Sequence, residues 1–217
     1  MRRRMYDRSV TWVRGLVLSS VAIFAASCSA TTDGVAEPPE RGVTGSETDT
    51  TAPQRTVSDP LDITPYLSEP CDLVSPEMLE DLGTSPEQAE PILPEDDELA
   101  AQTGPLCRWS GEAEGSIALG IDSGNRERGL GGLKGLEVSR DQGRYKLWEE
   151  VSVAGYPAVY LGVRDARADG DCDLAVGIAD DMTFGVTAHS FYDNPERACD
   201  VANELAADVI QTLKGER

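Results

Sequence analysis

Histidine, aromatic residues and basic residues are all scarce in this chain of 217 residues. It has one His, and Phe, Trp and Tyr together make up 6% of the sequence. Proton transfer near neutral pH and most transition-metal sites depend on His, so the sequence favours neither kind of chemistry. Lys and Arg number 19, against 39 Asp and Glu. Such acidity favours solubility and argues against a nucleic-acid partner.

The amino terminus lacks an apolar run long enough to cross a bilayer. Its uncharged stretch, residues 15–26, falls short of the roughly 20 residues that a spanning helix needs. Five Arg residues precede this stretch, and small residues lead from it to Cys28. This order is typical of a lipoprotein signal peptide at residues 1–27, and it predicts lipidation of Cys28.

A lipidated Cys28 would begin the mature chain and carry a diacylglyceryl group as well as a fatty acid such as palmitate. Two acyl chains hold a protein stably at a bilayer, whereas one does not. We therefore expect an extracytoplasmic protein anchored to the outer face of the cell membrane. Ala25 stands where such signals usually have Leu, so secretion after ordinary cleavage stays an alternative.

Without the predicted signal peptide, the chain holds 14 Lys and Arg against 38 Asp and Glu. The remaining chain divides into a tether and a single domain. Residues 29–60 are rich in Thr, Ser, Gly, Pro and Glu, which predicts that residues 28–60 form a disordered tether after the lipid. Residues 61–217 hold enough apolar residues for one core. The net negative charge of the mature chain argues against direct adhesion of this domain to anionic lipid headgroups.

Residues 61–217 read as an α+β domain, an antiparallel sheet packed by a short N-terminal and a long C-terminal helix. Ser75 and Gly83 bound the short helix, and Asn194 is the expected cap of the long helix, which continues to residue 213. Residues 86–103 are expected to be an acidic loop and residues 124–135 a flexible glycine-rich loop. Expected strands cover residues 107–109, 116–122, 145–153, 158–164, 172–179 and 182–189.

The four remaining cysteines, Cys71, Cys107, Cys172 and Cys199, predict two disulfides. Their spacings are much wider than those of zinc sites, and an even number suits an oxidising compartment. Sequence alone allows three connectivities. The hairpin at residues 172–189 brings Cys172 close to the start of the last helix, so we favour a bond between Cys172 and Cys199 and another between Cys71 and Cys107.

The order of these motifs resembles a known family. Pro70-Cys71-Asp72-Leu73-Val74, Cys107-Arg108-Trp109, Val153-Ala154-Gly155-Tyr156-Pro157 and the late Cys172 and Cys199 are similar to the actinobacterial lipoproteins grouped under domain of unknown function 3558. The resemblance implies a cell-envelope lipoprotein with a compact α+β domain and four Cys suited to two bridges. It brings no established catalytic residues.

Candidate catalytic and metal sites are weak in this sequence. Asp169-Gly170-Asp171-Cys172-Asp173 resembles a calcium loop, but Leu174 stands where the loop needs Gly. His189 and Asp193 lack the Gly-x-Ser-x-Gly motif that would accompany a hydrolase triad. We therefore predict no catalytic residues, no metal and no cofactor.

Aromatic residues offer a candidate binding surface. Besides Trp109, three of them lie within 13 residues, Trp148, Tyr156 and Tyr160. These three could form a stacking surface, with ordinary core packing as the alternative. We expect a non-catalytic domain that binds a small ligand or an envelope protein. The alternatives are a hydrolytic enzyme acting on cell-wall or lipid material and a structural surface antigen.

Overall fold

The computed structural model describes residues 56–110 and 115–216. The predicted signal peptide, Cys28 and most of the predicted tether lie outside the described residues. Within these residues, no helix is long and apolar enough to cross a membrane.

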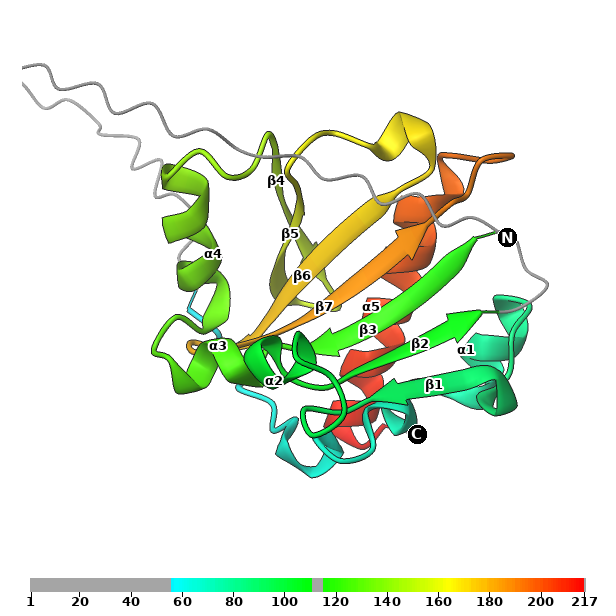
Figure 1. The fold of residues 1–217 in the computed structure, drawn as a ribbon, viewed down its shortest axis with the longest axis horizontal. Coiled ribbons are helices and arrows are strands. Elements are labelled where there is room, and N and C mark those ends of the chain that lie inside the picture. Colours follow the sequence, from blue (N-terminus) through cyan, green and yellow to red (C-terminus); the bar gives the residue numbers. More distant parts are fainter. Residues whose placement is uncertain (1–55, 111–114, 217) are drawn as a thin grey trace, which may run out of the picture. The chain divides into compact units, whose positions relative to one another are not determined.

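A seven-stranded sheet forms the centre of the domain (Figure 1). Its order is β1-β2-β3-β7-β6-β5-β4, and each described pair of neighbours is antiparallel. The chain is therefore an α+β protein in which the sheet dominates. The strands are β1 (Ala89–Ile92), β2 (Leu106–Ser110), β3 (Ser116–Ile121), β4 (Leu147–Val153), β5 (Tyr156–Gly162), β6 (Cys172–Ala179) and β7 (Met182–His189).

Helices lie before, between and after the strands. Short 3₁₀ helices cover Thr64–Tyr66, Pro70–Leu73, Pro86–Gln88 and Arg167–Asp169. The α-helices are α1 (Pro76–Asp81), α2 (Ala100–Thr103), α3 (Ser123–Glu127), α4 (Gly132–Asp141) and α5 (Arg197–Lys214). Ser75 caps α1 as predicted, because its hydroxyl accepts a hydrogen bond from the Met78 amide at 3.1 Å.

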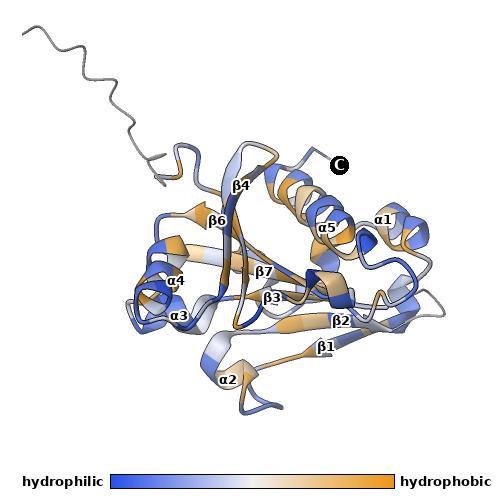
Figure 2. Ribbon diagram, turned by 90° about the horizontal axis from the view of Figure 1, so that it is seen from above, coloured by the Kyte–Doolittle hydropathy of each residue, from blue (hydrophilic) through white to orange (hydrophobic). Residues whose placement is uncertain are grey.

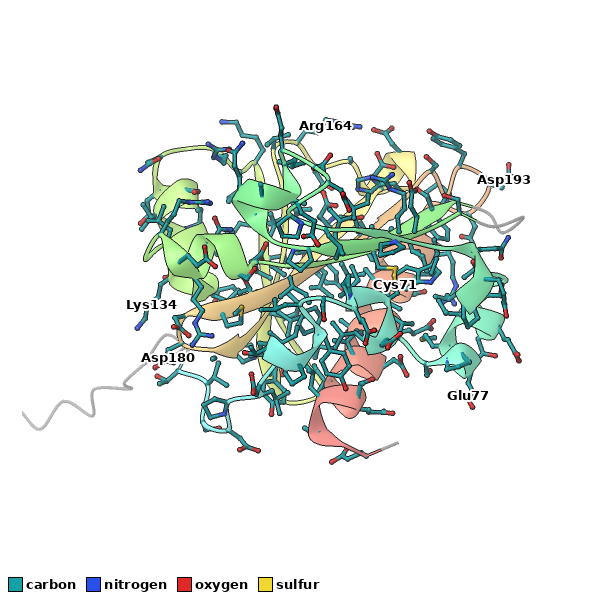
Figure 3. All side chains as sticks on the ribbon, turned by 60° about the horizontal axis from the view of Figure 1, so that its bottom comes forward. Cys71, Glu77, Lys134, Arg164, Asp180 and Asp193 are labelled. Carbon is teal, nitrogen blue, oxygen red and sulfur yellow. A yellow bond between two sulfur atoms is a disulfide. The ribbon has the colours of Figure 1, made fainter. Side chains whose placement is uncertain are left out.

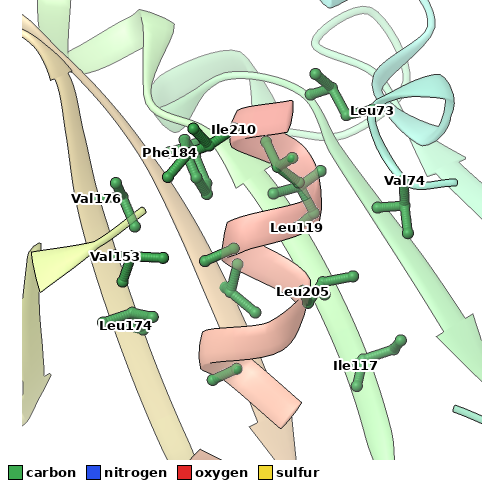
Figure 4. Close-up of a cluster of buried hydrophobic side chains, with 14 of the residues drawn as sticks. Leu73, Val74, Ile117, Leu119, Val153, Leu174, Val176, Phe184, Leu205 and Ile210 are labelled. Atoms are coloured by element: carbon green, nitrogen blue, oxygen red, sulfur yellow. The ribbon is translucent and has the colours of Figure 1, made fainter. Parts of the chain in front are cut away.

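Helix α5 covers one face of the sheet and forms most of the core with it (Figure 4). Leu205 and Ile210 are completely buried among side chains such as Leu119, Leu174 and Phe184. A buried Leu or Phe side chain contributes about 1.5–3 kcal/mol relative to an exposed one, so this face supplies much of the stability. The buried residues of α5 are Ala198, Val201, Ala202, Leu205, Ala206, Val209 and Ile210.

The prediction that Asn194 caps α5 is wrong. Helix α5 begins at Arg197, and its N-cap, Glu196, makes no side-chain cap bond. The Asn194 carbonyl instead accepts a hydrogen bond from the Arg197 amide at 3.0 Å, within a turn that precedes the helix. At the other end Gly215 adopts the left-handed conformation that stops the helix, as its position predicts.

The glycine-rich segment is not the flexible loop that the sequence predicts, because α3 and α4 occupy it. Gly131 and Gly132 allow α4 to touch the β6–β7 turn. A Cβ at Gly131 would lie 2.0 Å from the Asp181 carbonyl oxygen, and one at Gly132 would lie 2.2 Å from that of Asp180. These glycines are therefore packing positions. Leu133 and Leu136 of α4 then cover the sheet on the face opposite α5 (Figure 2).

The predicted acidic loop is also partly wrong, because residues 86–103 contain β1 and α2. Strand β1 carries Glu90 and Pro91, so its sequence lacks an apolar alternation. It forms by pairing with β2 at the edge of the sheet, where Glu90 is opposite Arg108 and their side chains lie 3.5 Å apart. An edge position tolerates proline and charge, which explains why the pattern was absent.

The two disulfides join the pairs that the sequence favours. Cys71 is bonded to Cys107, which ties the 3₁₀ helix Pro70–Leu73 to β2. Cys172 is bonded to Cys199, which ties the start of β6 to the first turn of α5. Both bridges lie on the α5 side of the sheet, where their cysteines contact the main core. Figure 3 labels Cys71 of the first bridge.

Candidate ligand-binding site

A cavity of about 290 Å³ lies at the end of the sheet where β2 finishes and β3 begins. Three parts of the chain build it: the end of α1, the β2–β3 strand ends, and the stretch from Phe191 to the start of α5. We call it the Trp109 cavity. Its lining consists of Asp81, Leu82, Gly83, Thr84, Trp109, Gly115, Ile117, Phe191, Arg197 and Val201.

Trp109 has an unusual environment for a buried residue. Its side chain is 1% exposed, yet its indole Nε1 has no hydrogen-bond partner, and it is the one buried side-chain nitrogen or oxygen in the described residues in this condition. A buried donor without an acceptor costs about 1–3 kcal/mol. Native structures retain such groups rarely, and local strain, a functional role, an ordered water or a bound ion are among the explanations.

Arg197 supplies the positive charge at the wall of the cavity. Its guanidinium donates two hydrogen bonds to the Glu204 carboxylate, at 2.8 and 2.7 Å. These bonds raise the pKa of Arg197 above its ordinary value, against the opposing effect of burial. This ion pair holds the Arg197 guanidinium in one place along the first two turns of α5. A ligand in the cavity would therefore contact a guanidinium that is already oriented.

Gly115 and Phe191 form a closely packed part of the cavity wall. Gly115 has a φ of +92°, and a Cβ there would lie 2.5 Å from the Phe191 ring. The Phe191 amide also donates to the Gly170 carbonyl at 3.0 Å. Glycine therefore permits an aromatic ring to lie against the backbone at the start of β3.

The Trp109 cavity has both apolar and polar residues in its lining. Leu82, Ile117, Phe191 and Val201 offer apolar contact, and Trp109, whose N–H is buried without an acceptor, also belongs to the lining. A ligand that fits would have an apolar body and one hydrogen-bond acceptor. Such sites use a few polar groups to orient a mainly apolar molecule.

Comparison with known proteins identifies the family. A family model described as "protein of unknown function (DUF3558)" matches residues 23–212. The chain belongs to the DUF3558 family. This confirms the family resemblance of its motifs. Comparisons with curated proteins and with solved structures gave no significant match.

The DUF3558 domain does not bring the three predicted surface aromatics together. Trp148 packs beside Leu161 on the α4 side of the sheet, whereas Tyr156 and Tyr160 contact the main core on the α5 side. Successive residues of a strand point to opposite faces, and the β4–β5 register pairs Trp148 with Leu161 but Val153 with Tyr156. Trp148, Tyr156 and Tyr160 therefore do not form one continuous surface.

Each of these three aromatics already has partners within the domain. The Arg140 guanidinium carbon lies 4.9 Å from the centre of the Trp148 ring, and the Tyr145 ring is 5.9 Å away. The Tyr156 hydroxyl donates to the Asp59 carbonyl at 2.9 Å, and the Tyr160 hydroxyl donates to the Cys199 carbonyl at 3.5 Å. Packing accounts for their positions.

The aspartates of the calcium-like segment are engaged by donors from the chain itself. Arg164 pairs with Asp169, and the Ser190 amide donates to Asp171 at 2.9 Å. No cluster of three or more His, Cys, Asp or Glu suited to a metal exists in residues 56–110 and 115–216. The carboxylates therefore stabilise the turn before β6.

The single His pairs with a carboxylate other than the one weighed from the sequence. His189 Nε2 lies 2.8 Å from Asp173 Oδ1, and this hydrogen bond raises the pKa of His189, against a smaller opposing effect of burial. The two residues occupy neighbouring strands, β7 and β6. In the part of the chain that the structure describes, His189 has no hydrogen bond to a serine, and its bond to Asp173 orders the end of the hairpin.

The Trp109 cavity was missed at the level of sequence. Trp109 stands in the Cys107-Arg108-Trp109 motif, which contributed to the family resemblance. The other walls come from segments about 30 residues before it and 80 residues after it, and no local pattern connects them. The available signal was the alternation of Cys107 and Trp109 on the buried side of β2.

Proposed function

We propose that this protein is an actinobacterial cell-envelope lipoprotein, anchored through Cys28, whose domain binds a small, largely apolar ligand in the Trp109 cavity without catalysing a reaction. The observation that carries the binding role is the Trp109 indole N–H, which is buried and lacks an acceptor while its ring lines a cavity. The hydrogen bond that the chain does not supply is the one a ligand would make.

The proposed location outside the cytoplasm is supported by the sequence and by the disulfides. Residues 1–28 have the charge, apolar stretch and small residues of a lipoprotein signal. Two disulfides in one domain favour an oxidising compartment outside the cytoplasm. The prediction of a lipoprotein rests partly on the resemblance to DUF3558, and the family match agrees with that resemblance.

The size and lining of the cavity limit the ligand. A cavity of about 290 Å³ is near the lower end of the range for small-molecule sites, so it suits a compact molecule or one end of a longer chain. Leu82 and Val201 in the lining favour hydrocarbon, and the Trp109 donor favours a carbonyl, ether or carboxylate oxygen. The expected occupant is therefore an amphipathic molecule with its oxygen buried.

Native mass spectrometry of the protein extracted gently from its own membrane tests the proposal. The denatured, non-reduced spectrum should show a diacylated Cys28 and the hydrogen loss of two disulfides. The native spectrum should show an additional mass that leaves on denaturation. A chain cleaved elsewhere without acyl groups would contradict the anchor, and a native mass equal to the denatured mass would contradict the carried ligand.

Two tryptophan variants locate the ligand. Trp109→Phe keeps an aromatic ring in the cavity and removes the donor, while Trp148→Phe makes the same change on the opposite face of the sheet. We expect the additional mass to fall at least fivefold in Trp109→Phe and to persist in Trp148→Phe, since a lost hydrogen bond costs about 1 kcal/mol or more. Equal retention in both variants would place the ligand elsewhere.

A further inference from the structure

Positive charge is concentrated in one segment of this acidic chain. Residues 123–148 hold six Lys and Arg and three Asp and Glu, a net charge of +3. The rest of the mature chain, residues 28–122 and 149–217, holds eight basic and 35 acidic residues. The chain has a net negative charge, but its segment 123–148 has a net positive charge.

The fold gathers this segment into one end of the domain. Residues 123–148 form α3, α4 and the connection to β4 (Figure 1). Arg126 and Arg140 pair with acids of the domain, Asp181 and Asp141. Arg128 is held by hydrogen bonds to the Gln102 carbonyl and to Asn125. In contrast, Lys134, Arg144 and Lys146 are exposed, and their side chains make neither an ion pair nor a hydrogen bond among the described residues. We call α3, α4 and these cations the basic end.

The basic end also exposes large apolar side chains. Leu130 is 53% exposed and Val138 is 49% exposed, whereas Leu133 on the inner side of α4 is 5% exposed. On α4, Lys134 and Val138 are four residues apart and so lie side by side on the outside of the helix. Such neighbouring cationic and apolar groups are the pattern of a surface that lies in the headgroup region of a bilayer. Each Lys or Arg near an anionic membrane adds to the attraction.

The chain that leads to Cys28 enters the domain at the same end. The Val57 amide donates to Asp180 Oδ1 at 3.3 Å, in the β6–β7 turn against which Gly131 and Gly132 pack. The sequence places 27 residues between Cys28 and Thr56. An anchor at Cys28 would therefore be connected to the domain at its basic end.

We propose that the basic end rests on an anionic lipid surface, with Lys134, Arg144 and Lys146 at the phosphates and Leu130 and Val138 at the headgroup boundary. The inference rests on the proposed anchoring of Cys28 for its biological setting. The Trp109 cavity lies where β6 starts and β7 finishes, at the opposite end of the central hairpin from the β6–β7 turn. The cavity would then face away from the membrane.

Vesicle flotation of the chain from residue 28 with Cys28→Ser tests the surface without the lipid anchor. The probe is phosphatidylglycerol vesicles at low salt, with phosphatidylcholine vesicles for comparison. We expect binding to phosphatidylglycerol alone. Lys134→Gln, Arg144→Gln and Lys146→Gln together should weaken it about 100-fold, from roughly fivefold for each charge near the surface.

A matched triple variant removes the same net charge from elsewhere. Arg108→Gln, Arg164→Gln and Lys214→Gln lie outside residues 123–148 and should weaken binding less than threefold, while circular dichroism verifies that both triple variants fold. Equal weakening by the two triple variants would mean that binding depends on the net charge of the protein and not on the basic end. Absence of binding to phosphatidylglycerol would contradict the proposal outright. Binding to phosphatidylcholine as well would show apolar insertion without the charge recognition that we infer.

The orientation is measured on the lipidated protein in vesicles that carry a quencher at the headgroups. A fluorophore at Val138→Cys should be quenched strongly, and one at Tyr192→Cys, 73% exposed and next to the cavity residue Phe191, should be quenched weakly. Equal quenching would contradict the orientation. The two proposals can fail separately. A denatured mass without acyl groups, together with successful flotation, would contradict the anchoring of Cys28 and support the lipid-binding surface. Acyl groups on Cys28, together with failed flotation, would support the anchoring and contradict the lipid-binding surface.

Discussion

The two faces of the sheet are covered by very different means. On the α5 face an extensive core of completely buried side chains and both disulfides hold helix and sheet together. On the α4 face the buried cluster contains only Leu133, Val159 and Ala175 in the described residues. The α5 face should therefore carry the global stability, while the α4 face should behave as a local layer that can loosen by itself.

Removing the disulfide of the α5 face should have the largest effect. Cys172→Ser with Cys199→Ser opens a loop with a sequence separation of 27 residues, which should lower the free energy of unfolding by about 3–4 kcal/mol. Urea unfolding followed by circular dichroism measures this. A loss below about 1 kcal/mol would mean that the helix is held to β6 by packing alone.

Matched leucine truncations compare the two faces directly. Leu205→Ala on α5 should cost about 3–4 kcal/mol, and Leu133→Ala on α4 about 2 kcal/mol, because fewer buried neighbours surround Leu133. Leu99→Ala, at a residue 62% exposed, serves as the control with little expected change. Equal costs for Leu205 and Leu133 would remove the distinction between global and local layers.

Two glycines with similar backbone conformations isolate the close packing of α4. Gly132 and Gly143 have φ of +71° and +77°, but a Cβ at Gly143 meets nothing within 4 Å. Gly143→Ala should cost about 1 kcal/mol from backbone strain, and Gly132→Ala about 2–3 kcal/mol, because its Cβ also collides with the Asp180 carbonyl. Hydrogen exchange should increase selectively in α4 of Gly132→Ala. An unchanged exchange rate there would contradict the packing role of Gly132.

The pH dependence of stability should reveal Asp122 on the α4 face. Burial raises its pKa from 3.8 to about 6, while a hydrogen bond from the Thr183 hydroxyl opposes the change. The folded state then holds its proton more tightly than the unfolded state, so this contribution is present below pH 4 and is lost as pH rises to about 6. Its size is about 2–3 kcal/mol.

Asp122→Asn provides the measurement. The variant keeps an oxygen for the Thr183 hydroxyl and cannot ionise, so its free energy of unfolding should vary less between pH 4 and pH 6.5 than that of the parent chain. Relative to the parent, it should gain stability at the higher pH. Parallel pH profiles for the two proteins would show that Asp122 titrates near its ordinary pKa.

The parts of the fold that the sequence predicts are those with strong local signals. The limits of β6 and β7 agree with the prediction because alternating apolar residues flank the Asp180-Asp181 turn. Helix α5 has a long apolar stripe and a glycine stop. Ser75 predicts the start of α1, because serine is a preferred N-cap residue. Each signal is contained within about 20 residues, where local propensity and burial agree.

The parts that the sequence misses depend on contacts between distant segments. Strand β1 is stabilised by its pairing with β2, and its own residues Glu90 and Pro91 argue against a strand. The glycines before α4 indicate flexibility locally, yet they are required by the approach of Asp180 and Asp181. The Trp109 cavity joins three separate segments, so the missing partner of its indole becomes visible only in the folded chain.

The placement of β7 between β3 and β6 has a consequence for the order of assembly. Strand β3 pairs with β7, about 70 residues later, so β1–β3 cannot join the rest of the sheet until β7 has been made. Each disulfide, however, closes within one contiguous stretch of chain, Cys71 with Cys107 and Cys172 with Cys199. Both bonds can therefore form between successive cysteines before the two halves meet. A chain made from its amino terminus has its bridges available early, and the docking of β7 onto β3 is the late, non-local step.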